Sequence, residues 1–453
     1  MIETVKRARV VIVGAGFAGL TVARRLRWTA VNVILVDRNN YHLFTPLVYQ
    51  VASALLDPSE VAQPVRRQIR SARNCDFLRA TVTGLDLAER QVLTDHGTLE
   101  YDYLVVAAGS ENNYFGNDSI RLRSLSVKDL PDAIAIRNWV LDLFERWRWT
   151  RSPEARRTML TFAVIGGGPT GVEYAGALSE LIRLSLRRDF GGQSLEDARV
   201  VLMEGSGRLL GIFDERLSAA ALRSLEKKGV EVWADAMVAE VSPREVRLKD
   251  GRSLKVGAVV WAAGVRASPV ASMLGVELSR QGRVPVTPTL QLESHPEVFV
   301  IGDMADANNL PMLAQPAMQE AKHAARGIHN LLTGRPLQPF RYRDLGTMAT
   351  IGRNSAIAQI GPLRLSGFLG WLLWLFVHLL NIVTLRARLA AMINWAWDYV
   401  FMDRPVRLLL RAAPTPIEEG EWNPETAGDA SSGVGATTAM DSARTSSKSL
   451  LES

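Results

Sequence analysis

Short, uninterrupted apolar runs alternate with amphipathic stretches along most of the chain. Residues 10–13 (VVIV) and 33–36 (VILV) flank one stretch of helical periodicity, and residues 162–165 (FAVI) and 200–203 (VVLM) flank another. Continuous apolar runs of this length, bounded by glycines and acids, are typical of strands buried on both faces of a parallel sheet. The pattern therefore predicts two β-α-β units in an α/β protein.

The first strand of each unit runs into a glycine-rich loop, and the second ends at an acid, Asp37 or Glu204. Such glycines permit a tight turn and the close approach of a pyrophosphate. The N-terminus of the following helix binds the phosphates, and the acid accepts a hydrogen bond from a ribose hydroxyl. Ordinary glycine turns are the alternative, but both loops have the strand, helix and acid around them. We therefore expect two bound dinucleotides and electron transfer between them. The glycines concerned are Gly14, Gly16 and Gly19 in the first loop and Gly166, Gly167, Gly168 and Gly171 in the second.

Three later segments extend these units. Residues 98–110 predict one strand ending in a small-residue turn at Gly109, and residues 259–264 repeat that turn at Gly264. Residues 298–303 predict a buried strand ending in Gly302-Asp303, where the acid can bind ribityl hydroxyls of a flavin or cap the next helix. Because this strand returns to the first unit, the second domain is expected to be inserted into the first. The expected boundaries are 1–115 and 286–340 for the first dinucleotide-binding domain, 116–157 for a helical connection, and 158–285 for the second dinucleotide-binding domain.

Composition and charge limit the kinds of partner that the protein can bind. A chain of 453 residues is long enough for two or three domains, and its net charge is +6. Residues 412–453 hold seven acids and two bases, so residues 1–411 carry +11. This excess suits polyanionic cofactors or an anionic lipid surface, and no basic run with interleaved aromatics indicates nucleic acid. The small-residue composition of 412–453 predicts a disordered acidic tail.

Cysteine usage excludes one mechanism. Cys75 is the only cysteine, so neither a disulfide nor a cysteine metal cluster can form within the chain. Flavin disulfide reductases need a pair of cysteines beside the flavin, and the sulfide-oxidising enzymes related to them need several thiols. Residues 41–58 contain no cysteine, so neither chemistry is available. The basic start at 6–9 before an apolar run resembles a signal peptide, but cleavage there would remove the strand that leads into the first glycine loop. We therefore expect the catalytic body on the cytoplasmic face of the cell membrane.

An apolar segment near the C-terminus predicts contact with lipid. Residues 367–385 contain no Asp, Glu, Lys or Arg, yet hold Trp371, Trp374, His378 and Asn381, which favour the interface over the bilayer centre. Residues 386–411 mix five arginines with aromatics, as in an amphipathic helix on an anionic surface. Monotopic attachment through 341–411 is therefore predicted; a single span and burial against the protein are the alternatives. The arginines are Arg386, Arg388, Arg404, Arg407 and Arg411.

Several motifs together resemble one family over residues 8–411. They are 37–52 (DRNNYHLFTPLVYQVA), 261–267 (WAAGVRA), 313–320 (LAQPAMQE) and 346–353 (GTMATIGR). With the glycine loops, they resemble the type II (alternative, non-proton-pumping) NADH dehydrogenases, which are NADH:quinone oxidoreductases. The Ala-Gln-x-Ala-x-Gln element and the aromatic C-terminal region are the most specific parts. The resemblance implies FAD as cofactor, NADH as substrate and a membrane quinone, ubiquinone or menaquinone, as acceptor, with homodimerisation as a family expectation.

The resemblance also implies residue roles. Glu173, two residues beyond Gly171, would serve nicotinamide binding or proton relay; the alternative is a carboxylate favoured by the helix dipole. Gln315 and Gln319 share one helical face and would bind flavin and quinone carbonyls. Glu204 favours NADH, although Arg208 leaves tolerance of NADPH open. The residues implied to hold FAD, besides Asp37, Asp303 and the first glycines, are Ala15, Phe17, Ala18, Arg38, His42, Val82, Ala317 and Met318.

Two other functions are compatible with both glycine loops. A soluble NADH-dependent ferredoxin or rubredoxin reductase would need neither the quinone element nor the aromatic, basic C-terminus. A redox-sensing flavoprotein would bind both nucleotides without turnover. The sequence favours the NADH:quinone oxidoreductase over both.

Overall fold

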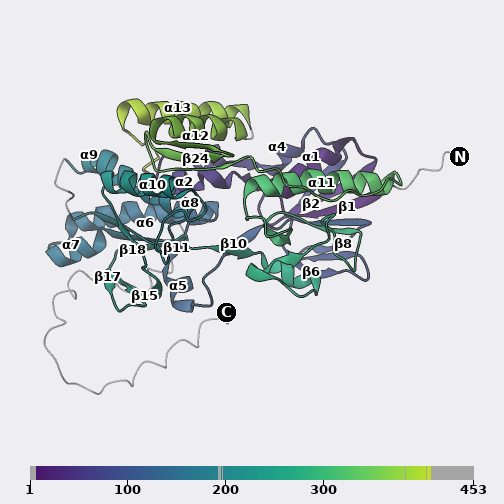
Figure 1. Cartoon of the computed structure of the whole chain (residues 1–453), viewed down its shortest axis with the longest axis horizontal. Helices are drawn as coiled ribbons and strands as arrows, with labels where there is room; N and C mark the ends of the chain where they lie inside the picture. The colour runs from purple at the N-terminus through teal and green to yellow at the C-terminus, as the bar shows by residue number, and fades with distance from the viewer. Residues whose placement is uncertain (1–6, 192–194, 196, 383, 405, 410–453) are drawn as a thin grey trace, which may run out of the picture.

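The computed structural model describes residues 7–191, 195, 197–382, 384–404 and 406–409. It consists of two α/β lobes side by side, with a pair of C-terminal helices lying across the top of one of them (Figure 1). The predicted acidic tail lies outside the described residues. Arg411 does too.

The first lobe is built on a five-stranded parallel sheet in the order β21-β9-β1-β2-β5. Alternate residues of β1 face opposite sides: Val10 and Ile12 pack with two helices, whereas Val11 and Val13 pack toward a small antiparallel sheet. The strands are β1 (Ala8–Val13), β2 (Val31–Asp37), β5 (Cys75–Arg79), β9 (Tyr103–Val106) and β21 (Val298–Val300). The helices are α1 (Phe17–Arg25) and α11 (Ala314–Leu332), and the small sheet is β6 (Val82–Asp86), β7 (Gln91–Thr94) and β8 (Gly97–Glu100).

The second lobe repeats this plan with the order β11-β18-β12-β13-β14. Its strands are β11 (Leu125–Ser126), β12 (Thr161–Ile165), β13 (Arg199–Met203), β14 (Val230–Trp233) and β18 (Ala258–Trp261). The main helices are α6 (Leu130–Trp149), α8 (Pro169–Glu180) and α10 (Glu215–Lys227). The small antiparallel sheet is β15 (Val238–Ser242), β16 (Glu245–Leu248) and β17 (Ser253–Lys255).

The C-terminal module is a three-stranded sheet carrying two helices. The strands are β23 (Thr347–Thr350), β24 (Ala356–Ile360) and β25 (Leu363–Ser366), and the helices are α12 (Gly367–Asn381) and α13 (Leu385–Phe401). Gly370 lets α12 lie close to β24, because a Cβ there would come 2.6 Å from the Ala356 carbonyl oxygen. Within the described residues, none of the helices has the length and apolarity that a membrane crossing requires. The segment 367–385 is not one helix, because α12 ends at Asn381 and α13 begins at Leu385.

Shorter elements join these parts. They are β3 (Tyr41–Leu43), α2 (Val48–Ala52), α3 (Pro58–Val61), β4 (Ala62–Pro64), α4 (Val65–Ile69), β10 (Ser110–Asn112), α5 (Asp118–Arg123), α7 (Pro153–Met159), α9 (Arg187–Asp189), β19 (Val265–Ala267), β20 (Val284–Pro285) and β22 (Ala305–Asp306). Strands β10 and β19 pair antiparallel and link the two lobes.

The expected fold class is confirmed, because β21 returns to pair with β9 after the whole second sheet has formed. The single strand expected over 98–110 is wrong. The chain leaves the small sheet after β8, and the Asp102 carboxylate accepts a hydrogen bond from the Arg9 N–H at 2.6 Å. Strand β9 then begins in the main sheet. The exact domain boundaries stay a prediction.

Candidate functional site

A cavity of about 1520 Å³ lies between the two lobes and extends to the C-terminal module. Both glycine loops line it, as do the turn at Gly109, the turn at Gly264 and the Gly302-Asp303 corner. The sequence-predicted site residues that line it are Ala15, Gly16, Phe17, Ala18, Asp37, Gly109, Gly166, Gly168, Glu173, Glu204, Gly264, Gly302, Asp303, Gln315 and Ala317.

The two glycine loops have nearly the same geometry. Gly14 and Gly166 have φ of +103° and +111°, which side-chain-bearing residues rarely adopt. A Cβ on Gly19 would come 1.8 Å from the Gly14 carbonyl oxygen, and a Cβ on Gly171 would come 1.8 Å from that of Gly166. These glycines therefore allow each helix to start directly against its strand.

The start of each helix can accept a phosphate group. Helices α1 and α8 have Gly16 and Gly168 at their N-caps, and no side chain caps either of them. A Cβ on either N-cap glycine would meet nothing within 4 Å, so there is open space beside the first amides. Free N–H groups and the helix dipole favour an anion there. This cradle fits the pyrophosphate of FAD in the first lobe and of NADH in the second.

Each acid at the end of a second strand braces its own glycine loop. Asp37 Oδ2 accepts a hydrogen bond from the Ala15 N–H at 2.7 Å, and Glu204 Oε2 accepts one from the Gly167 N–H at 2.6 Å. Burial raises the pKa of Asp37, against the effect of the Ala15 and Asn39 N–H groups. A carboxylate has about four acceptor positions, so both acids can also bind a ribose hydroxyl.

The Gly302-Asp303 corner is held from two sides. Asp303 Oδ2 accepts a hydrogen bond from the Ser110 hydroxyl at 2.5 Å. Behind the corner, the carboxylate of Glu320 accepts one from the Gly302 N–H at 2.5 Å. Burial raises the pKa of Glu320 to about 7. The pattern of acids and glycines along the chain did not indicate Glu320, whose position is fixed by the packing of α11 beneath this loop.

Glu173 lies at the end of the cavity that faces the C-terminal module. Its carboxylate accepts a hydrogen bond from the Thr350 N–H of β23 at 3.2 Å. Burial is the largest cause of its raised pKa of about 8, and the Thr350 N–H only partly offsets it. Such a carboxyl is protonated at neutral pH and can donate a proton.

His378 of α12 also lines this end, and sequence reasoning assigned it no chemical role. Its ring stacks on Trp374 with centroids 4.1 Å apart, and its Nδ1 lies 2.8 Å from the Trp374 carbonyl oxygen. Burial lowers the pKa of His378 to about 4, so it is neutral. A lone histidine in an otherwise apolar helix was the signal that could have identified it.

The two glutamines of α11 are placed differently. Gln315 lines the cavity, whereas both ends of the Gln319 amide bond to the backbone of Arg343. Gln319 Nε2 donates to the Arg343 carbonyl at 2.9 Å, and the Arg343 N–H donates to Gln319 Oε1 at 3.0 Å. A direct quinone contact of Gln319 stays a prediction, and this pairing would have to open for it.

Six residues implied for FAD are not among those that line the cavity: Gly14, Gly19, Arg38, His42, Val82 and Met318. His42 is buried behind the first loop, with Nδ1 at 3.0 Å from the Ala15 carbonyl oxygen and its ring edge-on to Phe17. Burial lowers its pKa to about 4. His42 thus braces the loop from behind. Arg208 is likewise absent from the lining and lies 3.5 Å from Glu215.

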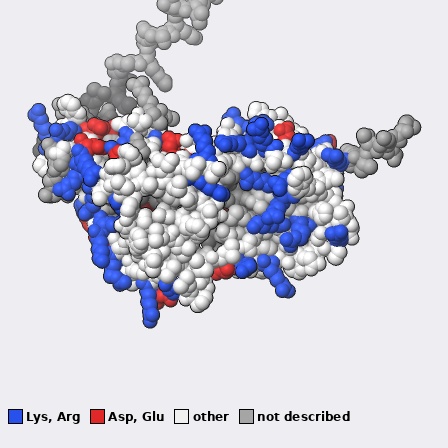
Figure 2. Space-filling view, turned by 90° about the horizontal axis from the view of Figure 1, so that it is seen from above, with Lys and Arg blue, Asp and Glu red and all other residues white. Residues whose placement is uncertain are grey.

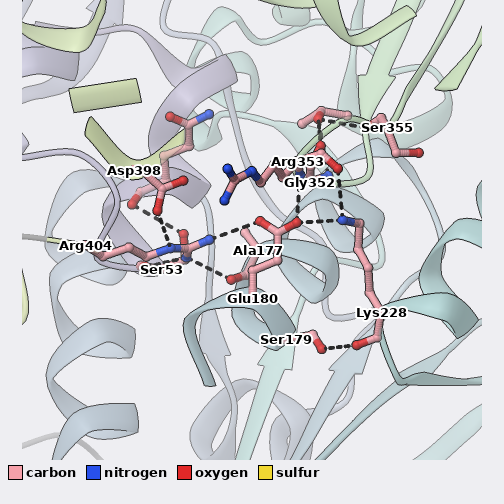
Figure 3. A network of polar contacts seen from close by, with 12 residues as sticks. Ser53, Ala177, Ser179, Glu180, Lys228, Gly352, Arg353, Ser355, Asp398 and Arg404 are labelled. Carbon is pink, nitrogen blue, oxygen red and sulfur yellow. Dashed lines mark hydrogen bonds and ion pairs between the residues drawn. The ribbon is translucent and has the colours of Figure 1, made fainter. Parts of the chain in front are cut away.

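A buried polar network joins the C-terminal module to α8 of the second lobe and to Ser53, just after α2 (Figure 3). Arg404 donates to the carbonyl oxygens of Ser53 and Ala177 at 2.8 Å and to Glu180 Oε2 at 3.2 Å. Glu180 also accepts from Lys228 Nζ at 2.6 Å. The placement of Arg404 on an anionic surface was therefore wrong. The three groups that accept its hydrogen bonds lie more than 200 residues away in sequence, so local composition could not reveal them.

The chain matches two family models that together cover this architecture. One is the pyridine nucleotide-disulphide oxidoreductase model, over residues 8–321, and the other is the NDH2 C-terminal domain, over residues 345–402. The type II NADH:quinone oxidoreductase Ndh of Mycobacterium tuberculosis is 39% identical over 414 residues, covering 88% of this chain and 89% of that protein. The chain belongs to the type II NADH:quinone oxidoreductase family.

A second curated relative and a solved structure support the same family assignment. NdhA of the same organism, also a type II NADH:quinone oxidoreductase, is 39% identical over 88% of both chains. The solved NDH2 of Plasmodium falciparum, in complex with NADH, has the same fold with a TM-score of 0.82 at 19% identity, over 89% of this chain and 100% of that one. The resemblance to type II NADH dehydrogenases found in the sequence is confirmed. FAD is the typical cofactor of this family.

Proposed function

We propose that this NADH:quinone oxidoreductase passes electrons through the cavity between its lobes, with FAD on the first glycine loop and NADH on the second. The observation that carries this proposal is that both phosphate cradles open into the same cavity. In each lobe the residue after a neighbouring strand lies against the first glycine of the loop: Ala107, after β9, lies against Gly14, and Ala262, after β18, lies against Gly166. The nicotinamide and the flavin ring can therefore meet face to face between the lobes.

FAD, when bound, supplies the chemistry of accepting a hydride and giving up two electrons. The chain's residues orient the reactants and supply protons. Reduction of a quinone to its quinol takes up two electrons and two protons, and the hydride brings only one proton. We assign the second to Glu173, whose buried, protonated carboxyl lies where the cavity meets the C-terminal module. Gln315 at the same cavity is assigned to a carbonyl of flavin or quinone.

We further propose that α12 and α13 attach the protein to an anionic lipid surface. Leu369 and Phe376 of α12 are 64% and 61% exposed, although Trp374 on the opposite side is buried. Figure 2 looks onto this side of the molecule, where a broad uncharged area is bordered by Lys and Arg. An apolar face with a basic border suits the boundary between headgroups and acyl chains. A quinone dissolved in lipid would then enter beside His378.

Vesicle sedimentation of the full chain tests this attachment. The double variant Leu369→Asp/Phe376→Asp should lose most binding to vesicles of phosphatidylglycerol, because two charges would enter the apolar layer. The matched control is Trp28→Asp/Trp149→Asp, which changes two residues that are 83% and 87% exposed elsewhere on the surface. The control should sediment like the parent. Equal sedimentation of all three proteins would contradict the proposal.

The cytoplasmic face of the cell membrane is proposed as the location. The chain has a single cysteine, which fits a reducing compartment, and NADH is its electron donor. Homodimerisation stays a family expectation.

A further inference from the structure

Negative charge predominates in the lining of the cavity. Five acids besides the protonated Glu173 line it, and they face two bound pyrophosphates if both nucleotides occupy the cavity. Among the described lining residues the only lysines are Lys128 and Lys249, and there is no arginine. The five acids are Asp37, Asp129, Glu204, Asp303 and Asp344. Lys249 follows β16, and its N–H bonds to the Met237 carbonyl, so it belongs to the NADH lobe. Lys128 is therefore the lining cation that can serve the FAD lobe.

Lys128 reaches the FAD lobe from the connection between the lobes. It follows β11, an edge strand of the second sheet, yet its Nζ donates to the Ser110 hydroxyl at 2.7 Å. That hydroxyl donates in turn to Asp303 Oδ2 at 2.5 Å. The three residues form a chain from the ammonium to the acid that we assign to the ribityl hydroxyls.

The ammonium keeps capacity for a ligand. A lysine has three N–H donors, and Ser110 takes one of them. Burial lowers the pKa of Lys128, while the nearby charges of Asp303 and Asp129 raise it. Because two acids are close, the side chain has electrostatic support for staying charged while it lines the cavity.

We infer that Lys128 is a positioning and tuning residue for the flavin: it orients Asp303 through Ser110 and raises the reduction potential of the bound cofactor. The inference rests on the proposed function, because it takes Asp303 as the ribityl acid. The ribityl chain joins the flavin ring at N10, so a cation beside the ribityl acid would be close to the edge of a bound flavin ring. A positive charge there favours the more electron-rich, reduced cofactor.

The test is the midpoint potential of the flavin, measured by anaerobic dye titration of the FAD-loaded full chain. Lys128→Met should shift the ratio of reduced to oxidised flavin about tenfold toward oxidised at a fixed potential, which is about 30 mV lower for a two-electron couple. Lys128→Arg keeps the charge and should stay near the parent value. Lys255→Met, which removes an exposed lysine paired with Glu154, is the matched control and should not change the potential.

Lys128→Gln separates charge from hydrogen bonding and replaces the methionine variant if that variant does not fold. It should show the lowered potential although it can still donate to Ser110. An unchanged potential in FAD-loaded Lys128→Gln, or weaker FAD retention with no change in potential, would overturn the inference. Failure of the parent protein to be reduced by NADH would instead refute the proposed function, so the two failures are distinguishable.

Discussion

The two glycine units of this enzyme can be compared almost atom by atom. In both, an added Cβ on the last glycine would come 1.8 Å from the carbonyl oxygen of the first, and an acid accepts a hydrogen bond from an N–H of the loop. They differ in the helix that leaves the loop. Helix α1 packs on α11 within its own lobe, whereas α8 carries two buried acids, Glu173 and Glu180.

These two acids connect the second unit to the C-terminal module. Glu173 accepts from the Thr350 N–H of β23, and Glu180 binds Arg404, just beyond α13. Seven residues separate them, so they lie two turns apart on a similar face of α8. The phosphate cradle is thus common to both units, while only the second unit places buried acids against the C-terminal module, where we propose that Glu173 supplies a proton.

A single added methyl group should separate the two units most strongly. Gly19→Ala should yield protein without FAD, because its Cβ would collide with backbone in the FAD loop. Gly171→Ala makes the same collision in the NADH loop and should give yellow protein that NADH bleaches about 100-fold more slowly, since a clash of this kind costs about 1–3 kcal/mol. The ratio of flavin to protein absorbance measures FAD retention, and anaerobic stopped-flow absorbance measures the bleaching rate.

A matched control for both variants is Gly211→Ala, where an added Cβ meets nothing within 4 Å. It should retain FAD and the parent rate. Full FAD occupancy in Gly19→Ala would show that the first loop does not hold the cofactor as we describe.

The next effect concerns the buried acid of α8. Glu173→Gln should slow quinone reduction about 100-fold through loss of a proton donor, while reduction of FAD by NADH continues. In the parent, activity should fall as pH rises through about 8, where Glu173 ionises, and the variant should lack this decline. Stopped-flow measurement of the two half-reactions across pH is the check; an unchanged pH profile would contradict the assignment.

The pH dependence of protein stability provides a second test of the raised pKa of Glu173. The folded-state pKa of Glu173 is raised from 4.5 to about 8, so its contribution to stability is fully present below 4.5 and is lost as pH rises through 8. The free energy of unfolding of Glu173→Gln should therefore decline less over this window than that of the parent.

A smaller effect is expected from the acid of the NADH unit. Glu204→Gln should raise KM for NADH about tenfold, because a charge-assisted hydrogen bond to ribose contributes about 1.5–3 kcal/mol. The same change should narrow the preference for NADH over NADPH, since like-charge repulsion of a 2′-phosphate is removed. Steady-state kinetics with both nucleotides measure it. An unchanged KM for NADH would show that Glu204 does not contribute to NADH binding.

Features set by neighbouring residues could be predicted from the sequence. The glycine loops, Asp37, Glu204 and the helical connection at α6 follow from short-range spacing, and the resemblance supplied the family. Features set by distant partners could not. Arg404 looked like a surface cation because its acceptors lie beside α2 and in α8, and Gln319 looked free because Arg343 binds it only after folding. Tertiary contacts decide burial and pairing, and one sequence does not contain them in any local pattern.

A sequential anaerobic titration of the purified full chain tests electron transfer between the two nucleotides most directly. We predict that one equivalent of NADH bleaches the yellow flavin band, and that a short-chain quinone then restores it with one equivalent consumed. A preparation loaded with FAD whose band NADH leaves unchanged would contradict the claim that both nucleotides meet in the cavity between the two lobes.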